Sequence, residues 1–234
     1  MSTKKFLNYI DMKKRSRIWF YTLSEIGLFV MFFNISFRSI AQESSNSLID
    51  TRDGKTYKTV TIGSIIWMAE NLAFKTSGGC WAYDLDTSNV TAYGYLYTMG
   101  AANSGVCPKG WFVPTMDEWN TLVNSVGGEL NSIGGYDSKL KEAGLTHWQS
   151  PNERSTNESG FTALPGGYKD YNNVFQGIGS YGSWWGGDLI ATISQGKPAE
   201  THDYFFISND KEGVFVGLGS DIKEGRSVRC VKKK

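Results

Sequence analysis

Histidine and cysteine are scarce in this chain of 234 residues, and their scarcity excludes several kinds of catalytic site. The two histidines, His147 and His202, stand at no metal-ligand spacing with each other or with any of the three cysteines. A zinc site normally needs three or four nitrogen, sulfur or oxygen ligands. A Gly-x-Ser-x-Gly motif for a hydrolase nucleophile is also missing. The sequence therefore predicts no catalytic residues and no zinc site.

Clustered basic residues are missing from most of the chain. Residues 1–41 hold seven basic and two acidic side chains, whereas residues 42–234 hold seventeen basic and twenty-one acidic ones. Affinity for nucleic acids comes chiefly from Lys and Arg side chains that neutralise phosphates. This charge balance excludes DNA and RNA as expected partners.

The basic excess at the N-terminus has the pattern of a secretory signal peptide. The basic cluster Lys13–Arg17 precedes an apolar stretch, Ile18–Phe37, and the small residues Ser39 and Ala41 then stand at the −3 and −1 positions of a cleavage site. We predict a signal peptide over residues 1–41. Met12 precedes the basic cluster, so translation starting there is an alternative.

A retained membrane anchor is the other interpretation of this segment. It needs about 20 predominantly apolar residues, and Glu25 and Asn34 interrupt the stretch, which favours cleavage. We expect a polar lead-in over residues 42–49 and a single domain over residues 50–234. The product is expected to be exported to the periplasm, the cell surface or the medium, with no membrane span after cleavage.

Local patterns predict a mixed α+β domain. The segment over residues 56–67 is rich in β-forming residues and contains Gly63-Ser64 as the turn of a hairpin. Thr115 and Glu118 form a capping box before an apolar helical face that ends at Gly127. Further helices are expected over 93–102 and 138–142, and short strands over 161–164, 204–207, 214–216 and 227–231.

Three cysteines allow one disulfide in an oxidising compartment. We predict the pair Cys107 and Cys230, because Cys107 introduces the capped helix and Cys230 lies in the last strand. The bond would tie the C-terminal edge of the sheet to the helical layer. Cys80 then remains as the odd thiol, and a small buried side chain is its simplest interpretation.

Two motifs suggest ligands but have the wrong context. Gly177–Gly182 spells the dinucleotide fingerprint G-x-G-x-x-G, yet two tryptophans follow where a helix should begin, so we interpret it as a flexible aromatic loop. Asp84, Asp86 and Ser88 match the first positions of a calcium loop, but Asn89 and Tyr95 replace its glycine and glutamate. We favour a simple turn there, with calcium in another geometry as the alternative.

Aromatic residues give the positive evidence for binding. Seven tryptophans follow Ala41, and those at 67, 111 and 119 sit inside strand and helix patterns, which predicts that they belong to the core. Aromatic rings in glycine-rich segments can instead contact sugars or proteins. We therefore choose Tyr181, Trp184, Trp185 and Asp188 as candidate ligand-binding residues, although core packing explains Tyr181, Trp184 and Trp185 equally well.

Seven ordered blocks then give a resemblance to a known family. They are Asp50–Tyr57, Trp67–Leu72, Cys80–Asp84, Tyr93–Tyr97, Cys107–Thr115, Asn157–Tyr168 and Ser227–Val231. Together they resemble the Fibrobacter succinogenes major paralogous domain, a family of exported and surface proteins of Bacteroidetes and Fibrobacteres without an established catalytic activity. The capped-helix block and the Arg-Cys-Val ending are also similar to the formylglycine-generating-enzyme group.

This second similarity implies a C-type-lectin-like fold, with two or three helices packed on a twisted antiparallel sheet and long irregular loops rich in glycine and aromatics. Catalysis of the formylglycine-generating kind needs two neighbouring thiolates for copper, and only Cys230 lies in the right region. We expect a non-catalytic binding domain without a required cofactor, whose partner is a glycan or a cell-surface protein. The alternatives are a structural component of an envelope or secretion assembly and, less favoured, an oxidoreductase of the formylglycine-generating type.

Overall fold

The structure is a computed structural model that describes residues 46–152, 154–194, 197–220 and 223–234. The predicted signal peptide, the alternative start at Met12 and most of the polar lead-in lie outside these residues. Within the described part of the chain, no helix has the length and apolar character needed to cross a membrane.

The first sheet joins the two ends of the described chain. Its four antiparallel strands run in the order β1-β2-β3-β11. They are β1 (Ser47–Ile49), β2 (Thr56–Ile62), β3 (Ile65–Met68) and β11 (Val231–Lys233). The predicted hairpin at Gly63-Ser64 is confirmed, and Gly63 has the positive φ of 61° that such a turn favours. Val231 pairs with Trp67, so the last strand closes the sheet beside the first hairpin.

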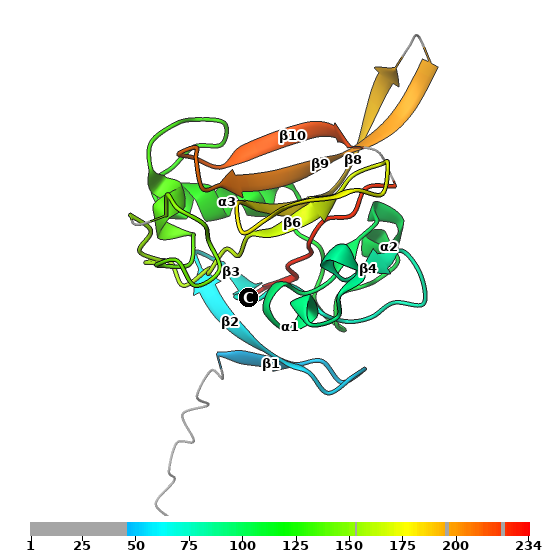
Figure 1. Cartoon of the computed structure of the whole chain (residues 1–234), viewed down its shortest axis with the longest axis horizontal. Helices are drawn as coiled ribbons and strands as arrows, with labels where there is room; N and C mark the ends of the chain where they lie inside the picture. The colour runs from blue at the N-terminus through cyan, green and yellow to red at the C-terminus, as the bar shows by residue number, and fades with distance from the viewer. Residues whose placement is uncertain (1–45, 153, 195–196, 221–222) are drawn as a thin grey trace, which may run out of the picture. The chain divides into compact units, whose positions relative to one another are not determined.

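The second sheet carries the candidate site. Its strands run in the order β10-β9-β8-β6-β7. They are β6 (Gly166–Lys169), β7 (Phe175–Ile178), β8 (Tyr181–Ser194), β9 (Lys197–Ser208) and β10 (Phe215–Ser220). All pairs are antiparallel except β6 with β8, which meet through Gly167 and Gly182. Figure 1 shows that the outer end of the β8–β9 hairpin extends beyond β10 and β6.

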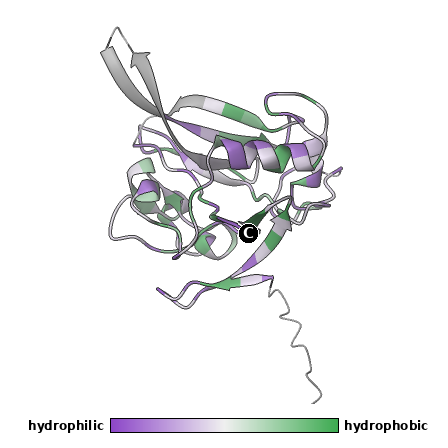
Figure 2. Ribbon diagram, turned by 180° about the vertical axis from the view of Figure 1, so that it is seen from behind, coloured by the Kyte–Doolittle hydropathy of each residue, from purple (hydrophilic) through white to green (hydrophobic). Residues whose placement is uncertain are grey.

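The helices are short and follow local signals. α3 (Met116–Ser125) has the predicted capping box, in which the Thr115 backbone N–H donates to Glu118 Oε2 at 2.9 Å. Figure 2 shows hydrophilic and hydrophobic colours alternating along this helix, as expected for one exposed and one buried face. The remaining short elements are β4 (Cys80–Trp81), η1 (Tyr83–Leu85), α1 (Asn89–Tyr93), β5 (Leu96–Tyr97), α2 (Met99–Asn103) and η2 (Tyr136–Lys139).

Two helix predictions need correction. The helix expected over 93–102 is divided into α1 and α2, because Gly94 ends α1 with a φ of 72° and the chain then enters β5. An added Cβ on Gly94 would lie 2.4 Å from the Leu72 carbonyl oxygen, so this turn also passes close to another segment. The helix expected over 138–142 is the 3₁₀ turn η2.

A cluster of buried rings lies between the two sheets and α3. Trp119 stacks on Phe205 with centroids 4.5 Å apart, and it also contacts Trp67 at 5.1 Å. Trp67 and Trp119 are buried as predicted, whereas Trp111 is half-buried beside a second cluster. Burial of each large apolar side chain stabilises the fold by about 1.5–3 kcal/mol. These rings fix the inner face of β8 and β9.

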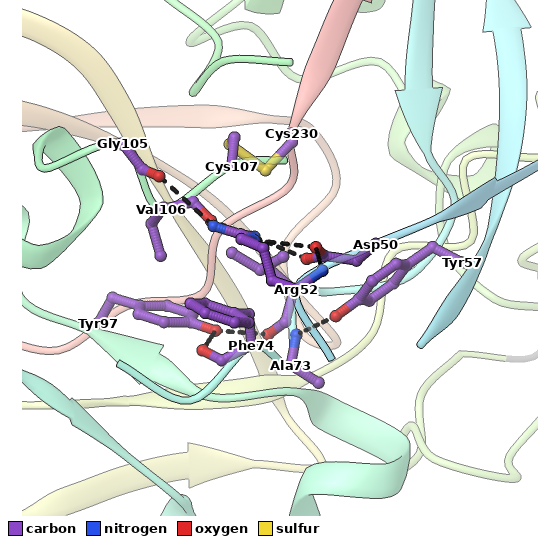
Figure 3. Close-up of a disulfide and its surroundings, with 11 residues drawn as sticks. Asp50, Arg52, Tyr57, Ala73, Phe74, Tyr97, Gly105, Val106, Cys107 and Cys230 are labelled. Carbon is purple, nitrogen blue, oxygen red and sulfur yellow. Dashed lines mark hydrogen bonds and ion pairs between the residues drawn. A yellow bond between two sulfur atoms is a disulfide. The ribbon is translucent and has the colours of Figure 1, made fainter. Parts of the chain in front are cut away.

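The second cluster contains the predicted disulfide, which is confirmed. The sulfurs of Cys107 and Cys230 are 2.05 Å apart and close a separation of 123 residues. Figure 3 shows Arg52 beside this bond. Its guanidinium donates to Asp50 Oδ2 at 2.6 Å and to the Val106 carbonyl at 2.7 Å. The N-terminal hairpin is thus tied to the segment that enters the disulfide.

Candidate functional site

Of the two interpretations given for Trp184 and Trp185, the structure shows core packing. Both belong to β8 and are 1% and 0% exposed. The Trp184 indole N–H donates to Asn71 Oδ1 at 2.9 Å, and the Trp185 indole N–H donates to the Tyr97 carbonyl at 2.6 Å. Both indoles therefore use their polar edges inside the protein and present no face to a ligand.

The acidic candidates form no described ligand site. Asp188 lies on β8, but its side chain is outside the described part of the structure. Asp84 and Asp86 are exposed, and the Ser88 backbone N–H donates to Asp86 Oδ1 at 2.9 Å and lowers the pKa of that carboxyl. Among the described side chains, no group of three or more His, Cys, Asp or Glu gathers as metal ligands would.

Tyr181 is the one aromatic candidate that reaches a surface cavity. It lines a pocket of about 310 Å³ on the outer face of the second sheet, which we call the tyrosine pocket. The lining residues are Tyr168, Asp170, Tyr171, Gln176, Tyr181, Tyr204, Glu224 and Arg226. Four tyrosines from β6, the β6–β7 turn, β8 and β9 therefore surround one space.

The register of the second sheet explains this gathering. Side chains two residues apart on a strand point to the same face, so Tyr204 and Phe206 face outward while Phe205 enters the core. The Tyr181 ring stacks on Phe206 with centroids 5.0 Å apart, and it lies 5.6 Å from Tyr168. The alternation in β9 was a sequence signal that could have placed Tyr204 on the outer face.

One edge of the pocket is a chain of hydrogen bonds. The Tyr168 hydroxyl donates to Gln176 Oε1 at 3.2 Å, and Gln176 Nε2 donates to Asp170 Oδ2 at 2.9 Å. Asp170 Oδ1 accepts the backbone N–H groups of Asn172 and Val174, each at 2.9 Å. The carboxylate is thereby held in the β6–β7 turn, and it fixes the polar edge beside the rings.

Arg226 forms the floor of the pocket. Its guanidinium carbon lies 3.4 Å from the centroid of the Tyr204 ring and 5.3 Å from that of Tyr168. It donates to Ser183 Oγ at 2.6 Å and pairs with Glu224. Burial lowers the pKa of Arg226, while the nearby Glu224 charge opposes this effect. Nothing in the neighbouring sequence marks this arginine as buried, so no role could be predicted for it.

Tyr168 and Tyr181 remain neutral under physiological conditions. Burial raises the pKa of Tyr181 and of Tyr168 above the ordinary value of 10. A neutral phenol both donates and accepts a hydrogen bond. The pocket therefore offers apolar ring faces next to hydroxyl, amide and carboxylate groups, and both carboxylates already have partners within the protein.

Arg229 is a second buried arginine with a structural role. Its Nε donates to Asn71 Oδ1 at 2.9 Å, and its two terminal nitrogens donate to the carbonyls of Phe161 and Thr162. Burial lowers its pKa to about 9, so it stays charged at neutral pH. The same Asn71 oxygen accepts the Trp184 indole N–H. This group cross-links the interior and does not open onto the tyrosine pocket.

Comparison with known proteins identifies a family match. A family model described as the Fibrobacter succinogenes major domain matches residues 60–232. No curated protein and no solved structure matches the chain. The matched region includes the whole second sheet and every residue that lines the tyrosine pocket.

Proposed function

The chain belongs to the Fibrobacter succinogenes major domain family, and from this premise we propose that it is an exported, non-catalytic binding domain whose tyrosine pocket holds a neutral carbohydrate. The observation that carries the proposal is the gathering of four tyrosines around a polar edge. Sugars combine flat C–H faces with hydroxyl groups at their rim. Tyrosine offers the matching combination of an apolar ring and a polar end.

The arrangement favours a neutral sugar over a cationic ligand. Aromatic cages with a nearby carboxylate commonly hold quaternary ammonium groups. Here the Arg226 guanidinium already lies against Tyr204 and Tyr168, and Glu224 pairs with it. The protein's own cation therefore occupies the position that a ligand cation would take. Arg226 also holds the two rings in place before a ligand arrives, which lowers the entropic cost of binding.

Export and fold type complete the proposal. The signal-peptide pattern over residues 1–41 and the disulfide, a bond typical of oxidising compartments, support delivery to the periplasm, the cell surface or the medium. The short helices beside antiparallel sheets are compatible with a C-type-lectin-like arrangement. Binding at the tyrosine pocket requires neither calcium nor Asp84 and Asp86, which do not line it.

Oxidoreductase chemistry of the formylglycine-generating type is the less favoured alternative. That chemistry needs two neighbouring thiolates. The Cys230 sulfur is bonded to Cys107, and Cys80 is the free cysteine in the described residues. A structural role in an envelope assembly would instead place a protein against the same rings, and this alternative is an outcome of the test below.

A glycan array probed with the purified chain tests the proposal, followed by titration calorimetry on each glycan that binds. Tyr171→Ala removes a ring that is 59% exposed, so the fold should survive. We expect its affinity to fall about 5- to 30-fold, the effect of losing one anchor of 1–2 kcal/mol. Val174→Ala is the matched control, because Val174 is exposed in the same turn and does not line the pocket. Absence of glycan binding, with capture of an envelope protein that depends on Tyr171, would replace this proposal with the structural one.

A further inference from the structure

The tyrosine pocket has a neighbour on each side, and each neighbour shares one tyrosine with it. Tyr171 also lines a pocket of about 420 Å³ that contains Trp81, which we call the Trp81 pocket. Tyr181 also lines a pocket of about 580 Å³ that contains Phe206, which we call the Phe206 pocket. The three cavities therefore form a row in which Tyr171 and Tyr181 are the dividing walls.

We propose that this row binds an internal stretch of a neutral polysaccharide, with at least one sugar unit in each of the three pockets. The inference rests on the proposed function, since it assumes that the tyrosine pocket binds a sugar. It adds the length of the ligand, its charge and the part of the chain that is recognised. The row continues on both sides of the tyrosine pocket, so a sugar bound there does not have to be a chain end.

Aromatic surfaces recur along the row at the positions where neighbouring units would pass. Tyr171, which is 59% exposed, lies between the Trp81 pocket and the tyrosine pocket. The Tyr181 and Phe206 rings are stacked with centroids 5.0 Å apart and an angle of 21° between their planes, at the boundary of the tyrosine pocket and the Phe206 pocket. In the Trp81 pocket, the Lys169 ammonium lies 4.2 Å from the Trp81 ring centroid. Each pocket therefore has aromatic walls, and the exposed Tyr171 ring, which the Trp81 pocket and the tyrosine pocket share, is the one on which the face of a sugar can pack directly.

The Phe206 pocket also has polar groups available for sugar hydroxyls. The Ser208 hydroxyl is buried and has no hydrogen-bond partner among the described residues. A buried hydroxyl normally has a partner, and Ser208 faces outward with Phe206 by the strand alternation. Gln149 is exposed at the same pocket, and no protein partner of its side-chain amide is found in the described part of the chain. The Gln149 amide can therefore bond to a ligand without breaking an internal contact, and the unpaired Ser208 hydroxyl lies beneath the same pocket.

The charges at the central pocket favour a neutral chain over a polyanion. The three pockets are lined by four basic side chains and three acidic ones. Two of the basic side chains are already engaged, Arg226 with Glu224 and Lys169 with the Trp81 ring. The acidic Asp170 and Glu224 stand at the central pocket. A chain of uronic acids would place its carboxylates beside these residues, whereas a neutral chain meets no such repulsion.

The test is titration calorimetry with cello-, xylo- and manno-oligosaccharides of one to six units, with hexagalacturonic acid as the charged probe. We expect affinity to rise at least tenfold from one unit to four or more. Gln149→Ala should weaken binding of the longer ligands about two- to tenfold, the fold-change of one lost hydrogen bond, and leave single sugars unaffected. Thr146→Ala is the matched control, because Thr146 is exposed in the same segment but lines none of the three pockets.

The stoichiometry on long chains tests internal recognition. Soluble xylan and glucomannan of several hundred units should each bind many protein molecules per chain, whereas recognition of chain ends would give one. Equal affinity for one and six units, one protein per long chain, a Gln149→Ala variant that behaves like Thr146→Ala, or tighter binding of hexagalacturonic acid would each overturn the inference while leaving the single-pocket function intact. Failure of every neutral sugar to bind would instead refute the proposed function itself.

Discussion

Asn71→Ala should be among the most damaging single substitutions in this protein, because one side chain satisfies four polar groups. Asn71 Oδ1 accepts from Trp184 Nε1 and from Arg229 Nε, both at 2.9 Å. Asn71 Nδ2 donates to the Tyr93 carbonyl at 2.9 Å and to Ser227 Oγ at 3.3 Å. A buried donor that loses its acceptor costs about 1–3 kcal/mol, and more when it is charged. The indole and guanidinium donors together predict a loss of about 3–5 kcal/mol in the free energy of unfolding.

Urea unfolding followed by tryptophan fluorescence, with the disulfide intact, measures this loss. Asn71→Asp keeps the acceptor oxygen that Trp184 and Arg229 use and adds a negative charge near Arg229, although it replaces the Nδ2 donor with a second oxygen. It should therefore lose clearly less stability than Asn71→Ala. Asn124→Ala is the surface control, because Asn124 is exposed on α3, and its effect should stay within about 0.5 kcal/mol. A loss below about 1 kcal/mol for Asn71→Ala, or equal losses for both Asn71 variants, would refute the assignment of Asn71 as the acceptor that the two donors need.

Three further predictions concern the disulfide, the alkaline limit of stability and the shape of the tyrosine pocket. Reduction of the Cys107–Cys230 bond, which closes a separation of 123 residues, should lower the free energy of unfolding by about 5 kcal/mol on chain-entropy grounds, as measured by denaturant unfolding with and without reductant. Burial raises the pKa of Tyr57 from its ordinary 10 to about 12. The contribution of its neutral phenol to the free energy of unfolding is therefore complete below pH 10. It is lost between pH 10 and 12, because Tyr57 ionises first in the unfolded chain. Tyr57→Phe should flatten this part of the stability profile by about 2–3 kcal/mol, and an unchanged profile would contradict the assignment. Gly217→Ala would place a methyl group 2.0 Å from Cζ of Tyr204 and displace that ring, so calorimetry should show sugar affinity reduced on the order of tenfold.

Features that depend on a few neighbouring residues could be predicted from the sequence. The capping box of α3 needs only Thr115 and Glu118 at a spacing of three, and it is present. The hairpin at Gly63-Ser64 is equally local. The disulfide could be predicted because three cysteines leave few pairings, and Cys230 directly precedes the last strand, β11.

The burial of Trp184 and Trp185 could not be predicted, because glycine next to an aromatic residue is found both in flexible loops and in closely packed strands. The glycines around Trp184 suggested a flexible loop, but they allow close packing. A Cβ on Gly182 would lie 2.4 Å from the Trp184 ring, and one on Gly187 would lie 2.9 Å from the Val113 carbonyl oxygen. The pairing of β8 with β9 and with the segment at Ser227 shows that these glycines serve close packing.

The tyrosine pocket was missed for a related physical reason. Its rings come from four separate segments, and the sheet order β9-β8-β6-β7 brings them together. Alternation within β9 predicts that Tyr204 and Phe206 share a face, but no local pattern predicts that Arg226 lies beneath them. The pocket thus depends on the pairing of strands that are far apart in the sequence, which no local pattern predicts.

The division of roles between interior and pocket explains why the family resemblance does not identify a ligand. Asn71, Phe161 and Arg229 lie in the blocks that carry the resemblance, and they cross-link the core through buried hydrogen bonds. Tyr171 and Tyr204 lie outside those blocks and face the pocket. The resemblance therefore covers the residues that hold the scaffold together and, of the four pocket tyrosines, Tyr168 alone. Under the proposed function, ligand choice would depend on the outward-facing positions outside these blocks, because they can change without breaking a buried hydrogen bond.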